Sequence, residues 1–87
     1  MRKIIDPFLY KVDYLDIHGY DRLSAAALIK NFLDNEIKIE SKKVVIIHGK
    51  GEGILKKTTH DYLKKDKRVL EYKLDIFNDG QTIVILK

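Results

Sequence analysis

Hydrophobic and polar residues follow two different periods along this chain, and these periods predict where strands and helices lie. Residues 15–18 alternate with the period of two that is typical of a strand, and Gly19 ends the pattern. Residues 22–38 place apolar side chains at the i, i+3, i+4 spacing of an amphipathic helix, with Asp21 before them as the N-cap. We therefore expect a strand followed by a helix in the first half of the chain.

The second half of the chain repeats this order and adds a hairpin. Residues 42–48 end in a continuous run of valine and isoleucine, which indicates a buried strand. From Gly53 the apolar spacing becomes helical again. Alternating apolar positions over residues 69–76 predict a third strand, and the turn signal at residues 78–80 separates it from a fourth strand over residues 82–86.

The resulting order, β-α-β-α-β-β, predicts an α/β two-layer sandwich. Two right-handed strand–helix–strand crossovers place both helices on one face of a four-stranded mixed sheet, whose last strand is antiparallel to the third. Residues 1–14 lack clean periodicity, although Tyr10, Val12 and Tyr14 could alternate as a short extended arm. Residues 1–13 are interpreted as an N-terminal extension. The domain itself is expected over residues 14–87.

Composition limits the classes of function that this chain can have. With 87 residues, 45% of them hydrophobic and 34% charged, it makes one small domain that leaves room only for a shallow, open site. It has no cysteine for a disulfide or a thiolate metal site, and its apolar runs fall far short of the ~20 residues of a membrane helix. We expect a cytoplasmic monomer without a membrane partner.

Positive charge is concentrated in the middle of the chain. Residues 42–73 hold ten of the seventeen Lys and Arg residues against four acids, so this third is about +6 while the remainder is about −2. A polyanion such as nucleic acid is a reasonable partner for such a surface. The alternative explanation of this positive charge is that the lysines only keep a small domain soluble.

Glycine recurs at alternate positions in residues 48–53 (HGKGEG), between the second strand and the second helix. The segment matches neither a Walker loop nor the dinucleotide-binding fingerprint. Its glycines nevertheless allow close backbone approach, and the N–H groups of a helix start attract an anion, with Lys50, Lys56 and Lys57 nearby. Because the carboxylate of Glu52 would oppose a phosphate there, a plain tight turn remains the alternative.

Asp16 and His18 are expected to project together at the carboxyl end of the first strand, ~7 Å apart at Cα. The carboxyl ends of parallel strands share one sheet edge, so this pair should lie near His48. An imidazole can transfer protons at neutral pH, and a carboxylate can orient it. The alternative is that Asp16 and His18 are two exposed polar residues at the end of a strand, without a catalytic role. His60 is expected to be an ordinary surface or boundary residue, and no zinc-binding spacing is present.

Taken together, residues 15–19 (LDIHG), residues 48–56 (HGKGEGILK) and residues 80–86 (GQTIVIL) resemble the small MutS-related, or Smr, domain over about residues 14–87. The resemblance implies a fold like the C-terminal domain of bacterial translation initiation factor three. It also implies a nucleic-acid-binding endonuclease that nicks DNA or cleaves RNA, with roles in recombination control or in cleaving messenger RNA on stalled ribosomes. The chain begins at Met1 without room for a MutS-like ATPase, so we expect a stand-alone member.

The resemblance also implies roles for single residues. Asp16 and His18 fall on the pair tied to cleavage, and His48 falls on the glycine loop, where it could be a second acid or base. The residues expected to bind nucleic acid are Gly49, Lys50, Gly51, Gly53, Lys56 and Lys57. We expect DNA or RNA as partner and no small-molecule cofactor, while a magnesium ion held by Asp16 is left open. The alternatives are a non-catalytic module that binds nucleic acid or the ribosome, and a protein-interaction domain that uses residues 1–14.

Overall fold

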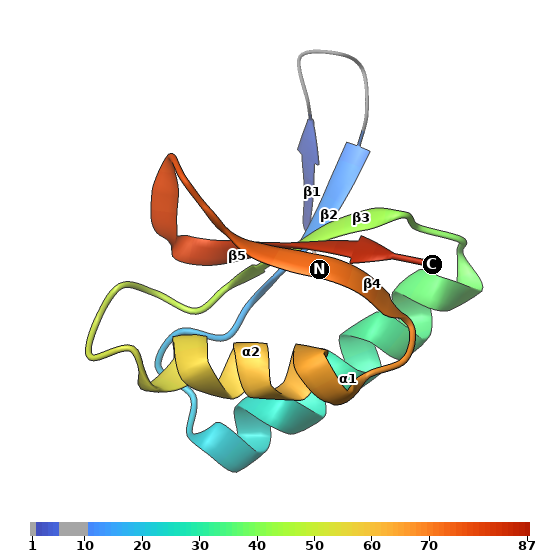
Figure 1. Ribbon diagram of the computed structural model, residues 1–87. Coiled ribbons are helices and arrows are strands. Elements are labelled where there is room, and N and C mark those ends of the chain that lie inside the picture. Colours follow the sequence, from blue (N-terminus) through green and yellow to red (C-terminus); the bar gives the residue numbers. More distant parts are fainter. Residues whose placement is uncertain (1, 6–10) are drawn as a thin grey trace.

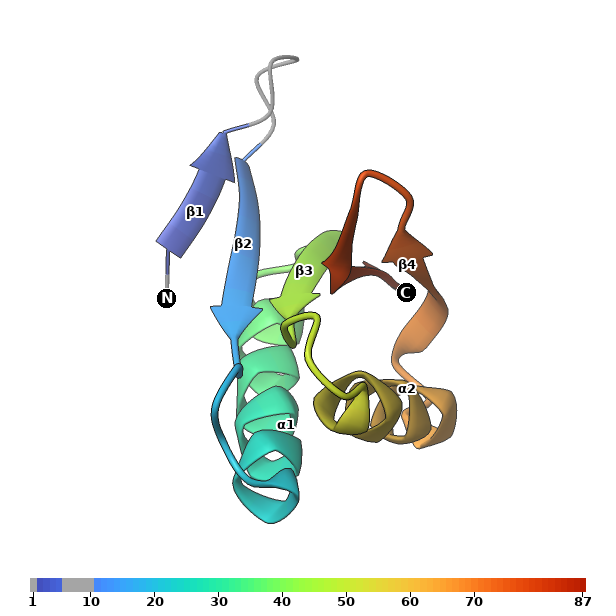
Figure 2. The ribbon, with the colours of Figure 1, turned by 90° about the vertical axis from the view of Figure 1, so that its left-hand side faces the viewer.

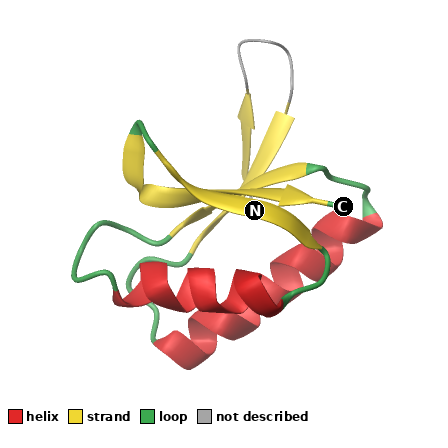
Figure 3. Ribbon diagram, viewed as in Figure 1, coloured by secondary structure: helices red, strands yellow, loops and turns green. Residues whose placement is uncertain are grey.

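A computed structural model describes residues 2–5 and 11–87, with side chains from residue 12 onward. Its elements are β1 (Arg2–Ile5), β2 (Lys11–Asp16), α1 (Arg22–Lys38), β3 (Lys43–Ile47), α2 (Ile54–Lys65), β4 (Val69–Asp75) and β5 (Asn78–Leu86). Both helices cover the same face of a single sheet, as Figure 1 and Figure 3 show. The predicted two-layer α/β architecture is therefore confirmed.

The sheet has the order β1-β2-β3-β5-β4. β2 and β3 are parallel, whereas β5 is antiparallel to both β3 and β4, so β2, β3 and β4 all run in the same direction. This confirms the predicted mixed sheet with two crossovers and a final hairpin. The structure adds one strand that was not predicted, since β1 pairs antiparallel with β2.

The bounds of the first predicted strand were wrong at both ends. β2 begins at Lys11, because its first residues pair with β1, and it ends at Asp16. His18 therefore lies in the turn after β2 instead of on the strand, while Ile17 still points into the core with no exposed surface. The expected arm included Tyr10, which lies outside the described residues.

The final hairpin turns at Ile76 and Phe77, two residues earlier than predicted. The Asp75 carboxylate accepts a hydrogen bond from the backbone N–H of Phe77 at 2.9 Å, which fixes the turn there. The predicted turn residues 78–80 instead form the start of β5, since Asn78 pairs with Asp75 across the hairpin.

The two helices begin in different ways. At α1 the predicted N-cap is confirmed, because Asp21 Oδ1 accepts a hydrogen bond from Ser24 N at 2.7 Å. At α2 the cap is Gly53 in the left-handed conformation (φ 82°), without a side-chain cap. The first helical hydrogen bond of α2 runs from Lys57 N to Gly53 O, so the three preceding amides have no partner within the helix.

A single apolar core lies between the helices and the sheet. The predicted helix stripe and the predicted buried strand meet there, and the fully or nearly fully buried members of the core are Ile17, Ala25, Ile29, Phe32, Leu33, Val44, Ile46, Leu63, Val84 and Leu86. No helix among the described residues is long and apolar enough to cross a membrane.

A polar network at the far end of the helices fixes their arrangement. Arg68, just before β4, donates to Asp34 of α1 at 2.6 Å and to Asp66 at 2.9 Å. The Tyr62 hydroxyl donates to the same Asp66 carboxylate at 3.0 Å. Hydrogen bonding from Arg68 lowers the pKa of Asp66 to about 2, so the network remains charged at neutral pH.

Candidate functional site

Asp16 and His18 form a hydrogen-bonded pair in the turn that follows β2. His18 Nδ1 lies 2.6 Å from Asp16 Oδ1, and the same oxygen accepts the backbone N–H of His18 at 3.1 Å. Because a carboxylate only accepts, Nδ1 carries the proton and Nε2 of the neutral ring keeps its lone pair. The side chains of His18 and Asp16 are 70% and 40% exposed, so even a polymeric substrate can reach Nε2.

The glycine loop (residues 48–53) lies directly beside this turn. β2 and β3 pair with Asp16 opposite Ile47, and Ile17 N donates to Ile47 O at 2.8 Å just beyond the last pair. A Cβ on Gly49, whose φ is +84°, would lie 3.5 Å from the Cβ of His18. Two motifs that are far apart in the sequence thus lie side by side, as predicted from the shared sheet edge.

A third segment, the start of β5, supports the loop from the other side. Gly80 O accepts hydrogen bonds from His48 N and Gly49 N, both at 2.9 Å. A Cβ on Gly80 would lie 3.2 Å from Lys50 Cγ and 3.5 Å from the carbonyl carbon of Gly49, so a side chain here would crowd Lys50 and pack against the loop backbone. The sequence marked Gly80 as a turn residue and as part of a motif, and it did not reveal this role.

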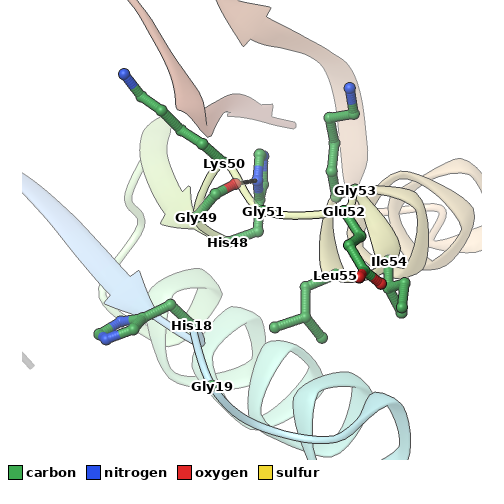
Figure 4. A pocket seen from close by; sticks show the side chains of 11 residues that line it. His18, Gly19, His48, Gly49, Lys50, Gly51, Glu52, Gly53, Ile54 and Leu55 are labelled. Carbon is green, nitrogen blue, oxygen red and sulfur yellow. Dashed lines mark hydrogen bonds between the residues drawn. The ribbon is translucent and has the colours of Figure 1, made fainter.

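His48 lies behind the loop. Its ring is turned away from His18 in Figure 4, and the residue is only 4% exposed. Its Nδ1–H donates to Gly49 O, and its Nε2 accepts the hydroxyl of Thr82, both at 2.9 Å. Burial lowers the pKa of His48, which favours the neutral ring. This position favours a structural role over the expected role of a second acid or base in contact with substrate.

His60 of α2 completes a chain of hydrogen bonds that the sequence did not reveal. Its Nε2–H donates to Thr82 Oγ1 at 2.7 Å, so one hydroxyl connects His60 with His48. The ring centroid of His60 lies 6.1 Å from that of His48 and 5.0 Å from that of Tyr72. Burial and the nearby His48 lower the pKa of His60. His60 was expected to be an ordinary surface or boundary residue, but it joins α2 to β5 and the loop.

A shallow hollow of about 390 Å³ opens between the turn and the loop (Figure 4). Its lining consists of His18, Gly19, residues 48–53 and the first residues of α2, Ile54–Lys56. The free amides at the start of α2 therefore border the hollow, which suits an anion. The exposed carboxylate of Glu52 also lines it and opposes that preference.

The three lysines that were predicted to bind nucleic acid differ in their ion pairs. Lys50 Nζ lies 3.6 Å from Asp79 Oδ1, and Lys57 Nζ lies 2.7 Å from Asp61 Oδ2. Within residues 12–87 no ion pair involves Lys56, whose Cε lies 3.9 Å from the place of a Cβ on Gly53. Lys56 is consequently the cation most available above the loop. In the described part of the chain, no three His, Asp or Glu side chains are grouped as a metal site would require.

Comparison with known proteins yields a consistent set of relatives. The model of the Smr domain matches residues 15–87. The chain is 42% identical over 76 residues to endonuclease MutS2 of Carboxydothermus hydrogenoformans, covering 84% of this chain and 10% of that protein. It is 37% identical over 68 residues to endonuclease MutS2 of Clostridium tetani, covering 78% of this chain and 9% of that protein. This chain thus spans about a tenth of the length of these relatives.

Two crystal structures share the fold. The Smr domain of Thermus thermophilus MutS2 superposes with a TM-score of 0.84 at 25% identity, covering 87% of this chain and 99% of that one. YdaL, a stand-alone small MutS-related protein from Escherichia coli, superposes with a TM-score of 0.81 at 19% identity, covering 85% and 63%.

Proposed function

Because this chain belongs to the Smr domain family, we propose that it is an endonuclease that cleaves RNA or DNA strands at the Asp16–His18 pair. The observation that carries the proposal is the 2.6 Å hydrogen bond between His18 Nδ1 and Asp16 Oδ1. It fixes the ring so that Nε2 faces solvent as a proton acceptor, and Asp16 stabilises the imidazolium that forms.

On RNA, His18 Nε2 would take the proton of a 2′-hydroxyl, whose oxygen attacks the adjacent phosphorus. The bond from phosphorus to the 5′-oxygen then breaks, and the leaving 5′-oxygen takes a proton from the imidazolium or from water. On DNA, which lacks the 2′-hydroxyl, a water molecule deprotonated by His18 would attack the phosphorus. One phosphorus–oxygen ester bond of the backbone then breaks, and the leaving oxygen takes a proton from the imidazolium or from water. General base catalysis of this kind contributes roughly 10²–10⁴-fold to the rate.

The glycine loop would hold the phosphate next to His18. The amides at the start of α2 donate to its oxygens, and Lys56 and Lys50 supply positive charge from the loop side. Lys57, which pairs with Asp61, would contact a more distant phosphate. His48 and Thr82 act from behind as positioning residues, because their hydrogen bonds fix the loop and not the substrate.

A nuclease assay tests the proposal. Single-stranded RNA and supercoiled plasmid are incubated with the wild type and with His18→Ala, each with and without EDTA. We expect cleavage of at least one substrate by the wild type and a loss of roughly 10²-fold or more in His18→Ala. Undiminished cleavage by His18→Ala would overturn the mechanism. Activity that EDTA removes and magnesium restores would make Asp16 a candidate metal ligand.

The second candidate is a module that binds nucleic acid or the ribosome without cleaving it. The observation that favours it is Glu52, whose carboxylate lines the hollow in which the phosphate would lie. Such a module would bind with a steep salt dependence and leave every substrate intact.

A further inference from the structure

The turn between β4 and β5 carries the two most exposed large apolar side chains among the described residues. Ile76 is 88% exposed and Phe77 is 92% exposed. Two-residue hairpin turns normally contain Asn, Asp or Gly, and the sequence has all three immediately after this turn. Exposing rather than burying such side chains forgoes about 1.5–3 kcal/mol each. Exposed apolar side chains at turn positions that favour polar residues or glycine are typical of a functional surface.

This hairpin tip, Ile76 and Phe77, is held in place by its neighbours. Asp75 accepts hydrogen bonds from Phe77 N at 2.9 Å and from Gln81 Nε2 at 2.8 Å, through different carboxylate oxygens. The side chain of Asn78 accepts from Gly80 N at 3.0 Å. The tip is therefore ordered before any partner binds, which lowers the entropic cost of binding.

The hairpin tip lies on the same side of the molecule as the glycine loop. In Figure 1 both protrude on the left, and in Figure 2, which shows the molecule from that side, both face the viewer. Asp16, Ile47 and Gln81 are neighbours across three adjacent strands, and β4 is the next strand. The tip lies ~12–14 Å from Asp16 across the strands, at ~4.8 Å per strand, and ~13 Å beyond Gln81 along β5, at ~3.3 Å per residue. The total distance is roughly 18 Å, which corresponds to about five nucleotides of a stacked strand at ~3.4 Å each.

We propose that the hairpin tip contacts unpaired bases of the substrate, with Phe77 stacking on a base and Ile76 packing beside it. The inference rests on the proposed function and names its substrate class: RNA or DNA with unpaired bases a few nucleotides from the scissile phosphate. Two apolar side chains beside a phosphate-binding loop suit one or two bases. They cover far less than the ~800 Å² per partner of a stable protein interface.

Two acids lie near the tip, and each has a partner within the hairpin or the loop. Asp75 accepts hydrogen bonds from Phe77 N in the turn and from Gln81 Nε2 of β5, and Asp79 lies 3.6 Å from Lys50, which offsets part of its charge. Lys73 is exposed on β4 close to the hairpin, so the strand would pass between positively charged side chains.

Binding measurements in the His18→Ala background test the proposal without cleavage of the probe. Fluorescence anisotropy of labelled oligonucleotides compares single strands with duplexes of the same sequence. We expect Phe77→Ala to weaken single-strand binding roughly tenfold, the loss of one base stack, and duplex binding less than twofold. Phe77→Tyr should restore most of the affinity. The matched control is Leu70→Ala, since Leu70 is 65% exposed near the other end of β4 and should change neither affinity.

A fluorescent reporter gives an independent readout, because the chain contains no tryptophan. In Phe77→Trp, single-stranded RNA or DNA should quench the indole fluorescence, whereas Leu70→Trp should remain unquenched. Unquenched fluorescence in Phe77→Trp, or equal losses on single strands and duplexes in Phe77→Ala, would overturn the proposal and indicate a protein partner or none for the tip. Quenching in Phe77→Trp, together with a wild type that cuts no substrate, would reject the nuclease and leave the base contact standing.

Discussion

At the scale of single residues, three histidines show how environment decides the chemistry of one side chain. His18 is exposed and hydrogen-bonded to a carboxylate, which leaves one ring nitrogen free for a substrate. His48 is buried with both ring nitrogens bonded to the protein, and His60 is half-buried against Thr82. Only His18 therefore combines access with a basic nitrogen.

Glu52 is the residue whose charge most directly opposes a phosphate in the hollow. Glu52→Gln should raise the affinity for single-stranded nucleic acid roughly two- to fivefold at low salt, and the gain should shrink at high salt as the carboxylate is screened. Anisotropy at two salt concentrations measures the effect. Glu71→Gln removes an exposed acid on β4 and serves as the control. Unchanged affinity in Glu52→Gln would mean that phosphate does not enter the hollow.

At the scale of elements, the hydrogen-bond chain from His60 through Thr82 to His48 joins α2, β5 and the end of β3. The pKa values of both histidines are lowered, chiefly by burial. The unfolded chain thus binds protons more readily than the folded one near pH 6.5. The contribution of the two neutral histidines to the free energy of unfolding is fully present above that pH. It is lost as the pH falls through the lowered pKa values of the folded state.

Urea unfolding at about pH 8 and about pH 5 tests this linkage. The wild type should lose stability at the lower pH, and His60→Gln should lose less because one titrating group is gone. Equal pH dependence in the wild type and in His60→Gln would contradict the linkage.

The Arg68 network holds the opposite end of the two helices. Asp66→Asn should lower the free energy of unfolding by about 1–3 kcal/mol at neutral pH, because it removes the charged acceptor of Arg68 and Tyr62. The pKa of Asp66 is about 2, below its usual 3.8, so the difference from wild type should persist above pH 4 and disappear as the pH falls through 2. Lys67→Ala, at an exposed neighbour, should stay within about 0.5 kcal/mol. A free energy of unfolding for Asp66→Asn that equals that of Lys67→Ala would contradict a stabilising role of the Arg68 network.

At the scale of the whole molecule, the two-layer fold brings three separate segments to one sheet edge. The turn after β2, the loop after β3 and the start of β5 meet there, while both helices lie below (Figure 1). The sheet thus presents the Asp16–His18 pair, the glycine loop and the hairpin tip at one edge. Such an open arrangement suits a polymer better than a small molecule.

Local patterns in the sequence were sufficient to predict the helices, the buried strand β3 and the contact between the two motifs. Periodicity and capping reflect interactions within a few residues, and the shared edge follows from parallel crossovers. The burial of His48 and the role of His60 were not predictable, because both depend on β5 lying beside β3. The turn at Ile76 and Phe77 was misplaced because Asn78, Asp79 and Gly80 carry a stronger turn signal.

The proposed chemistry depends most on one exposed imidazole, and restoring that imidazole chemically tests it. Single-turnover cleavage is measured for the wild type, for His18→Ala and for the control Tyr20→Ala, which changes an exposed neighbour in the same turn. We expect His18→Ala to lose roughly 10²-fold or more in rate, free imidazole to restore part of it, and Tyr20→Ala to remain active. Cleavage by His18→Ala at the wild-type rate would contradict the central claim.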